Sequence, residues 1–68
     1  MILTINEEKK EFANGINITQ LLEVQGVQNP DMLSVILNDS FVHKSVYNET
    51  SLKDGDNITF LYFMGGGA

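Results

Sequence analysis

One short segment places the strongest constraint on the fold. Residues 16–26, INITQLLEVQG, begin with a helix-start pattern in which Asn17 is a good N-cap and Gln20, three residues later, completes a capping box. Gly26 suits the position that ends a helix, because glycine adopts positive φ at little cost. The segment therefore predicts a helix of about two to three turns. A helix this short is marginal in water, so we expect it to be held by packing against a sheet.

Three other segments have the apolar alternation and β-branched residues of strands, namely 1–12, 33–42 and 57–64. Polar residues at 6–8 interrupt the first segment and Asn-Asp at 38–39 interrupts the second, so each predicts a hairpin. The third follows the sequence DGD at 54–56, whose residue types favour a turn. Residues 43–52 show no clear periodicity and are predicted to form an irregular crossover.

The predicted order of elements is β-β-α-β-β-β. This order indicates an α+β fold in which one main helix packs on a mixed sheet of roughly four to five strands. The first and last strands are apolar enough to be neighbours at the centre of that sheet. We predict a folded domain over residues 1–64 and a flexible glycine-rich tail over 65–68, because glycine loses more backbone entropy on ordering than any other residue.

Composition argues against several classes of function. The 68 residues include no cysteine, which removes disulfides, thiolate nucleophiles and most structural zinc sites. Nine acidic and four basic residues give a net charge of −5, which argues against nucleic-acid binding. The sequence shows no apolar run near the ~20 residues of a membrane span and no signal-peptide pattern, so we expect a cytoplasmic protein without membrane contact.

Candidate catalytic side chains are few. The single histidine, His43, lies in a polar segment and is more typical of a surface position than of a catalytic one. Asp54 and Asp56 could form a carboxylate pair, but turn formation explains them better. No helix follows the glycine run at 65–67, so it does not have the context of a phosphate loop. We therefore expect no metal site and no bound cofactor.

The last predicted strand, NITFLYFM at 57–64, has more apolar residues than a one-sided sheet requires. Alternation assigns Ile58 and Phe60 to the core, which leaves Leu61, Phe63 and Met64 near the surface. Two interpretations remain open for these three residues. They complete the edge of the core, or they form a docking patch for a partner protein.

The tail itself also allows two interpretations. Gly65, Gly66, Gly67 and Ala68 could be a frayed terminus or cloning residues. Alternatively, a chain without Cβ atoms could thread a narrow channel and carry its terminal carboxylate into the active site of a partner. An extended chain of four residues spans roughly 13 Å, which is enough to enter a cleft.

The sequence as a whole resembles the ubiquitin-like sulfur carriers of the ThiS/MoaD family, and in length it is closer to the ThiS type. The resemblance rests on the β-grasp order of elements, on VILND at 35–39, on LKDGDNITF at 52–60 and on the glycine pair Gly66-Gly67. It covers essentially the whole chain. It implies the β-grasp (ubiquitin-like) form of the α+β fold.

The resemblance also implies a mechanism. In this family an adenylating enzyme of the ThiF/MoeB type uses ATP and Mg²⁺ to activate the carboxylate of the terminal glycine. A sulfur donor then converts the adenylate to a thiocarboxylate, which delivers sulfur to a biosynthetic enzyme such as a thiazole synthase. By this resemblance Gly67 bears the thiocarboxylate, Gly65 belongs to the lead-in, and the protein is a monomeric cosubstrate and not an enzyme.

The sequence departs from the family pattern at two places. Ala68 follows the glycine pair, and relatives with extra residues are trimmed by a protease, often a zinc metalloprotease, so we predict that Ala68 is removed. His43 and Lys44 stand where thiamine-type carriers often have Pro-Arg. Thiamine thiazole synthesis is the leading expectation. The alternatives are a sulfur carrier for methionine, cysteine or molybdopterin synthesis, a ubiquitin-like modifier that joins lysines, and a β-grasp interaction domain with an inert tail.

Overall fold

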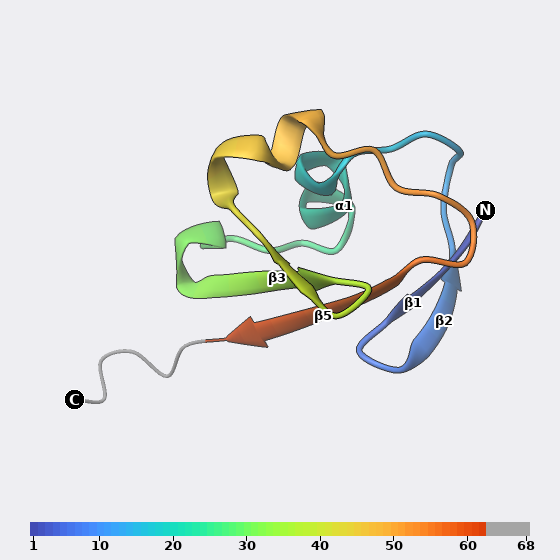
Figure 1. Ribbon diagram of the computed structural model, residues 1–68, viewed down its shortest axis with the longest axis horizontal. Coiled ribbons are helices and arrows are strands. Elements are labelled where there is room, and N and C mark those ends of the chain that lie inside the picture. The colour runs from blue at the N-terminus through green and yellow to red at the C-terminus, as the bar shows by residue number, and fades with distance from the viewer. Residues whose placement is uncertain (63–68) are drawn as a thin grey trace.

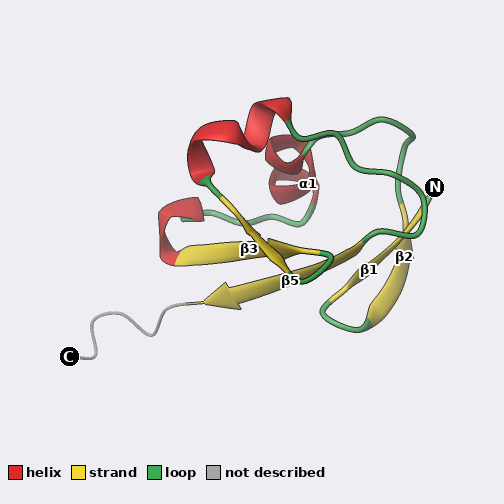
Figure 2. Ribbon diagram, in the orientation of Figure 1, coloured by secondary structure: helices red, strands yellow, loops and turns green. Residues whose placement is uncertain are grey.

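The computed structural model describes residues 1–62, which form one sheet with helical segments on one of its faces (Figures 1 and 2). Its elements in chain order are β1 (Ile2–Ile5), β2 (Glu8–Glu11), α1 (Ile18–Val24), the 3-10 helix η1 (Pro30–Met32), β3 (Leu33–Leu37), β4 (Ser40–Val42), the 3-10 helix η2 (Lys44–Glu49) and β5 (Asn57–Tyr62). The predicted β-β-α-β-β-β order and α+β architecture are confirmed.

The sheet has five strands in the order β2-β1-β5-β3-β4. β1 and β5 run parallel, whereas β1–β2, β3–β5 and β3–β4 are antiparallel, so the sheet is mixed as predicted. The first and last strands are neighbours, and β5 occupies the centre. The last described strand therefore lies in the middle of the sheet (Figure 1).

Helix α1 follows the capping signals of its sequence. The Asn17 side chain accepts from the Gln20 N–H at 2.8 Å, and the Gln20 side chain accepts from the Asn17 N–H at 2.9 Å. At the other end Gly26 has φ of +74°, and the N–H of Val27 bonds back to the carbonyl of Leu22 at 3.0 Å. This is the Schellman arrangement that ends a helix, so both predicted boundaries are confirmed.

The core lies between α1 and one face of the sheet. The side chains of Leu3, Ile18, Leu21, Val35 and Ile58 have the largest volumes among those that are fully buried. They come from α1 and from the three central strands, so each strand contributes residues of one parity to the core. The opposite parity faces away from the helix, and this second face of the sheet has no covering layer among residues 1–62 (Figure 2).

The crossover between β4 and β5 was predicted incorrectly. Instead of an irregular segment over residues 43–52, Lys44–Glu49 form η2, which packs against α1. Tyr47 is buried from η2 and Leu52 is buried after it. The hydroxyl of Thr50 donates to the carbonyl of Val46 at 2.7 Å and helps to close the last turn. Packing of a single aromatic side chain, rather than a repeating apolar pattern, therefore explains this helix.

Candidate functional site

The end of β5 is the part of the structure closest to the predicted tail. Ile58 and Phe60 are buried and Leu61 is exposed, as the alternation of the sequence predicted. Tyr62 lies opposite Leu33 at the end of the sheet, where it is 58% exposed. The remaining predicted residues, Phe63, Met64, Gly65, Gly66, Gly67 and Ala68, lie outside the described residues.

Leu61 belongs to an apolar surface on the open face of the sheet. In register, Ser34 lies opposite Leu61, and Ile36 lies opposite both Thr59 and Phe41. Directly opposed residues of antiparallel strands point to the same face, so Ile36, Phe41 and Leu61 lie together on the face away from α1. We call these three residues the open-face patch. Phe41 is 70% exposed and Leu61 is 45% exposed, which is unusual for large apolar side chains without a partner.

Phe41 was missed as a candidate at the sequence level, although a signal for it exists. The hairpin loop between β3 and β4 contains only two residues, Asn38 and Asp39, and so Leu37 pairs with Ser40. That register places Phe41 opposite Ile36, and Ile36 points to the face opposite to that of the buried Val35. Loop length therefore determines the orientation of Phe41.

Two hairpin turns hold β5 in place from opposite sides. Asn6 and Asn38 each begin a two-residue loop with positive φ, the geometry of a type I′ turn. The Oδ1 of Asn6 accepts from the N–H of Phe60 at 2.8 Å, and the Oδ1 of Asn38 accepts from the N–H of Asn57 at 2.9 Å. The strand that leads to the tail is thus fixed to both hairpins as well as to its neighbours.

The DGD sequence forms the predicted turn. Asp56 Oδ2 accepts from the N–H of Lys53 at 2.8 Å, and Gly55 has φ of +90°. Asp54 Oδ1 accepts from the N–H of Ile2 at 2.6 Å, so this turn also closes on the start of β1. Both carboxylates have structural bonding partners, which explains the motif without an acid–base pair.

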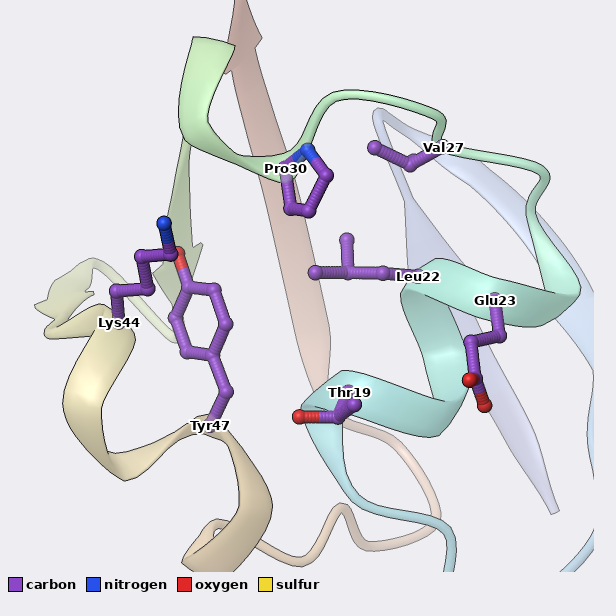
Figure 3. A pocket seen from close by; sticks show the side chains of 7 residues that line it. All are labelled: Thr19, Leu22, Glu23, Val27, Pro30, Lys44 and Tyr47. Carbon is purple, nitrogen blue, oxygen red and sulfur yellow. The ribbon is translucent and has the colours of Figure 1, made fainter.

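A cavity of about 300 Å³ lies on the helical side of the sheet, between α1 and η2 (Figure 3). Leu22 and Tyr47 approach it from opposite sides, and Pro30 lies at one end. Lys44, at the edge, forms an ion pair with Asp31 of η1. Burial raises the pKa of the Tyr47 phenol, with a backbone hydrogen bond at Val35 acting in the opposite direction. The phenol is therefore protonated at neutral pH. The lining of the cavity is mainly apolar.

Other chemistry is sparse in residues 1–62. They contain no group of three or more His, Cys, Asp or Glu side chains arranged to hold a metal ion. His43 is exposed at the N-cap position of η2, and its side chain makes no capping bond. No helix in this part of the chain is long and apolar enough to cross a membrane. The distinctive features are therefore an apolar open face and a central strand that ends beside it.

The chain is similar in sequence and fold to known proteins. The family model described as the ThiS family matches residues 2–67. The crystal structure of a thiamine biosynthesis protein (ThiS) from Geobacter metallireducens superposes with a TM-score of 0.87 at 38% identity, covering 98% of this chain and 100% of that chain. The NMR solution structure of a thiamine biosynthesis protein from the same organism gives a TM-score of 0.81 at 37% identity, covering 100% of this chain and 90% of that one.

A longer protein contains a similar segment. A thiazole synthase of Paramagnetospirillum magneticum is 34% identical over 68 residues, which is 100% of this chain and 21% of that protein. The chain thus spans about a fifth of the length of this curated relative. The likeness concerns that portion of the thiazole synthase alone.

Proposed function

The chain belongs to the ThiS family, and we propose that it is a sulfur carrier whose Gly67 carboxylate becomes a thiocarboxylate. A carboxylate is a poor electrophile until one of its oxygens becomes part of a good leaving group. A carboxylate oxygen attacks the α-phosphorus of ATP, pyrophosphate leaves, and an acyl-adenylate forms. Sulfur from a donor then attacks the acyl carbon and AMP departs, which leaves the thiocarboxylate.

The extent of the family match is the observation that best supports Gly67 as the reactive residue. The match includes Gly66 and Gly67 and ends before Ala68. A residue after Gly67 would occupy its carboxylate in a peptide bond, so that bond has to be hydrolysed before activation. We propose that a protease, such as a zinc metalloprotease, removes Ala68. Adenylation would then act on the free carboxylate of Gly67, which follows Gly65 and Gly66.

The described geometry supports docking on an enzyme of the ThiF/MoeB type. Gly67 lies five residues beyond Tyr62, a distance of at most about 18 Å when extended. An enzyme that holds Gly67 in its active site must therefore lie close to the end of β5. The open-face patch adjoins this end and offers apolar area for the contact, to which we add Phe63 and Met64. The net charge of −5 favours a basic rim on the partner.

This function requires no catalytic side chain in the chain itself. ATP and Mg²⁺ belong to the adenylating enzyme, and the carrier contributes only its terminal carboxylate and its docking surface. Such a protein is a cosubstrate, since catalysis takes place in the sites of its partners.

We further propose a thiazole synthase as the enzyme that accepts the sulfur. The support is the segment similar to this chain within a protein named thiazole synthase, together with the two structural relatives named as thiamine biosynthesis proteins. Joining a carrier domain to the enzyme that it serves would raise their effective concentration. Sulfur delivery to methionine, cysteine or molybdopterin synthesis is the alternative that acceptor assays would distinguish.

The experiment compares three C-termini in the presence of the adenylating enzyme, ATP, Mg²⁺ and sulfide. The form ending at Gly67 is expected to exchange one oxygen for sulfur, and the forms ending at Ala68 and at Tyr62 are expected to remain unchanged. Conversion of the form with Ala68 still attached would contradict the trimming step. Isopeptide conjugates to lysines, in place of the thiocarboxylate, would instead identify a protein modifier.

A further inference from the structure

The side of β5 that faces β1 is paired over only part of its length. The parallel register between them consists of Thr4 with Asn57 and Ile5 with Ile58. After Ile5 the chain turns away into the β1–β2 hairpin, while β5 continues to Tyr62. Figure 1 shows the end of β5 projecting past that hairpin. Residues 59–62 therefore have β3 on one side and no strand of residues 1–62 on the other.

The hydrogen bonds show which backbone groups point to that side. The carbonyls of Asp56 and Ile58 accept from β1 and its turn, and the N–H of Phe60 donates to the Asn6 side chain. The carbonyl of Asn57, in contrast, accepts from Asn38 on the β3 side. Strand alternation then places the carbonyl of Phe60 and the N–H of Tyr62 toward the vacant side. Neither group has a hydrogen-bond partner within residues 1–62. We call these two groups the free edge of β5.

The other two edges of the sheet are less suited to strand addition. All four residues of β2 are exposed and charged, and charged side chains disfavour pairing with another strand. β4 has only three residues. The free edge of β5 lies next to the exposed apolar side chains of Leu61 and Tyr62, and it continues directly into the segment that ends at Gly67.

We propose that an extended segment of the adenylating enzyme pairs with the free edge of β5. This inference rests on the proposed function, because an enzyme that takes up Gly67 must pass alongside residues 60–62. A carbonyl of the enzyme accepts from the N–H of Tyr62, and an N–H of the enzyme donates to the carbonyl of Phe60. Backbone pairing of this kind fixes the direction of the strand. The glycine tail then starts from a defined point, which reduces the entropy lost when it enters the active site.

A pair of variants at Tyr62 isolates the backbone donor from the side chain. Tyr62 and Leu33 form a pair without mutual hydrogen bonds, so Tyr62→Pro removes the N–H without breaking a bond to β3. Tyr62→Ala removes the side chain and keeps the N–H. Measured on the form ending at Gly67, Tyr62→Pro is expected to raise the Kd for the adenylating enzyme roughly tenfold above that of Tyr62→Ala. Equal Kd values for the two variants would overturn the proposal.

Amide hydrogen exchange on the unsubstituted chain provides a test that does not depend on the folding of a variant. The Tyr62 amide is expected to exchange quickly in the free chain and to become protected in the complex. The Leu61 amide faces β3 and should be protected in both states. Rapid exchange of the Tyr62 amide in the complex would overturn the proposal. Protection of this amide in the free chain that increases with the concentration of the chain would also overturn it, because a second copy of the chain would then occupy the free edge.

Thiocarboxylate formation separates failure of this inference from failure of the proposed function. If the unsubstituted form ending at Gly67 is converted while Tyr62→Pro and Tyr62→Ala bind equally, only the strand pairing is wrong. If the unsubstituted form neither binds nor is converted, the proposed function fails and the strand pairing fails with it.

Discussion

The side-chain oxygen of Asn6 accepts a hydrogen bond of 2.8 Å from the backbone N–H of Phe60, which lies 54 residues later in the chain. In a regular parallel ladder a backbone carbonyl of β1 would accept this bond. Here the chain has already entered the hairpin turn, and the Asn6 side chain takes its place. Asn6 therefore has two functions, because it forms the turn with positive φ and it fastens that turn to the strand leading to the tail.

Replacement of Asn6 by glycine should separate these two functions. Glycine retains the positive φ at little cost but leaves the part-buried N–H of Phe60 without its acceptor. We expect Asn6→Gly to lower the free energy of unfolding by about 1–2 kcal/mol, measured by urea denaturation.

Asn38→Gly is the matched control for that experiment. Asn38 has the same position in its own two-residue turn. Its side chain accepts from the N–H of Asn57 and donates from Nδ2 to Asp56 Oδ1 at 3.0 Å, and both bonds are exposed to water. The loss of stability should therefore be smaller than for Asn6→Gly. An equal or larger loss in Asn38→Gly would show that burial of the bond does not determine its contribution.

The two faces of β5 should respond differently to substitution. Ile58 is fully buried, and Ile58→Val is expected to reduce the free energy of unfolding by about 0.5–1.5 kcal/mol through the lost methylene and the space it leaves. Leu61 is 45% exposed, so Leu61→Ala should change stability by less than about 0.5 kcal/mol. Thermal or urea unfolding of both variants tests which face of β5 lies in the core. A larger loss of stability in Leu61→Ala than in Ile58→Val would contradict the assignment of Ile58 to the core.

The open-face patch predicts the position of a partner interface. Phe41 is 70% exposed, so Phe41→Glu should leave the fold intact. We expect it to weaken binding to the adenylating enzyme on the order of tenfold. We expect Leu61→Glu and Phe63→Glu to act in the same direction. Val24→Glu is the control, since Val24 is 65% exposed at the end of α1 on the opposite side of the sheet. Equal weakening by Val24→Glu and Phe41→Glu would argue for a general effect of charge.

Tyr47 predicts a loss of stability at alkaline pH. Burial raises the pKa of its phenol in the folded protein above the ordinary value of 10.0. The unfolded chain then releases this proton first, so the contribution to stability is complete below pH 10 and declines as the pH rises through the higher folded pKa. The chain has two tyrosines, so an ultraviolet titration of Tyr62→Phe reports Tyr47 alone. Titration at or below the ordinary pKa would contradict its burial.

Local signals in the sequence were sufficient for most of the fold. Asn17, Gln20 and Gly26 define both ends of α1 because capping depends on residues close together in the chain. The two-residue loops at Asn6 and Asn38 set the hairpin registers for the same reason. In contrast, η2 depends on the packing of Tyr47 against α1, a long-range contact that no periodicity of residues 43–52 reveals.

The candidate site was predictable only in part. Strand alternation correctly placed Leu61 at the surface. Strand alternation did not predict that Leu61 and Phe41 belong to one surface, because this depends on the order β5-β3-β4 in the sheet. The free edge of β5 likewise results from the short pairing of β1 with β5, which is a property of the tertiary structure.

The mass of the form ending at Gly67, before and after incubation with the adenylating enzyme, ATP, Mg²⁺ and sulfide, is the most direct test of the sulfur-carrier function. We expect a mass increase that corresponds to the exchange of one oxygen for one sulfur, located at Gly67 by fragmentation. The increase should be absent without ATP. The sulfur-carrier function would be contradicted by an unchanged mass under conditions in which the same enzyme activates another ThiS-family carrier. It would also be contradicted by sulfur found at any residue other than Gly67.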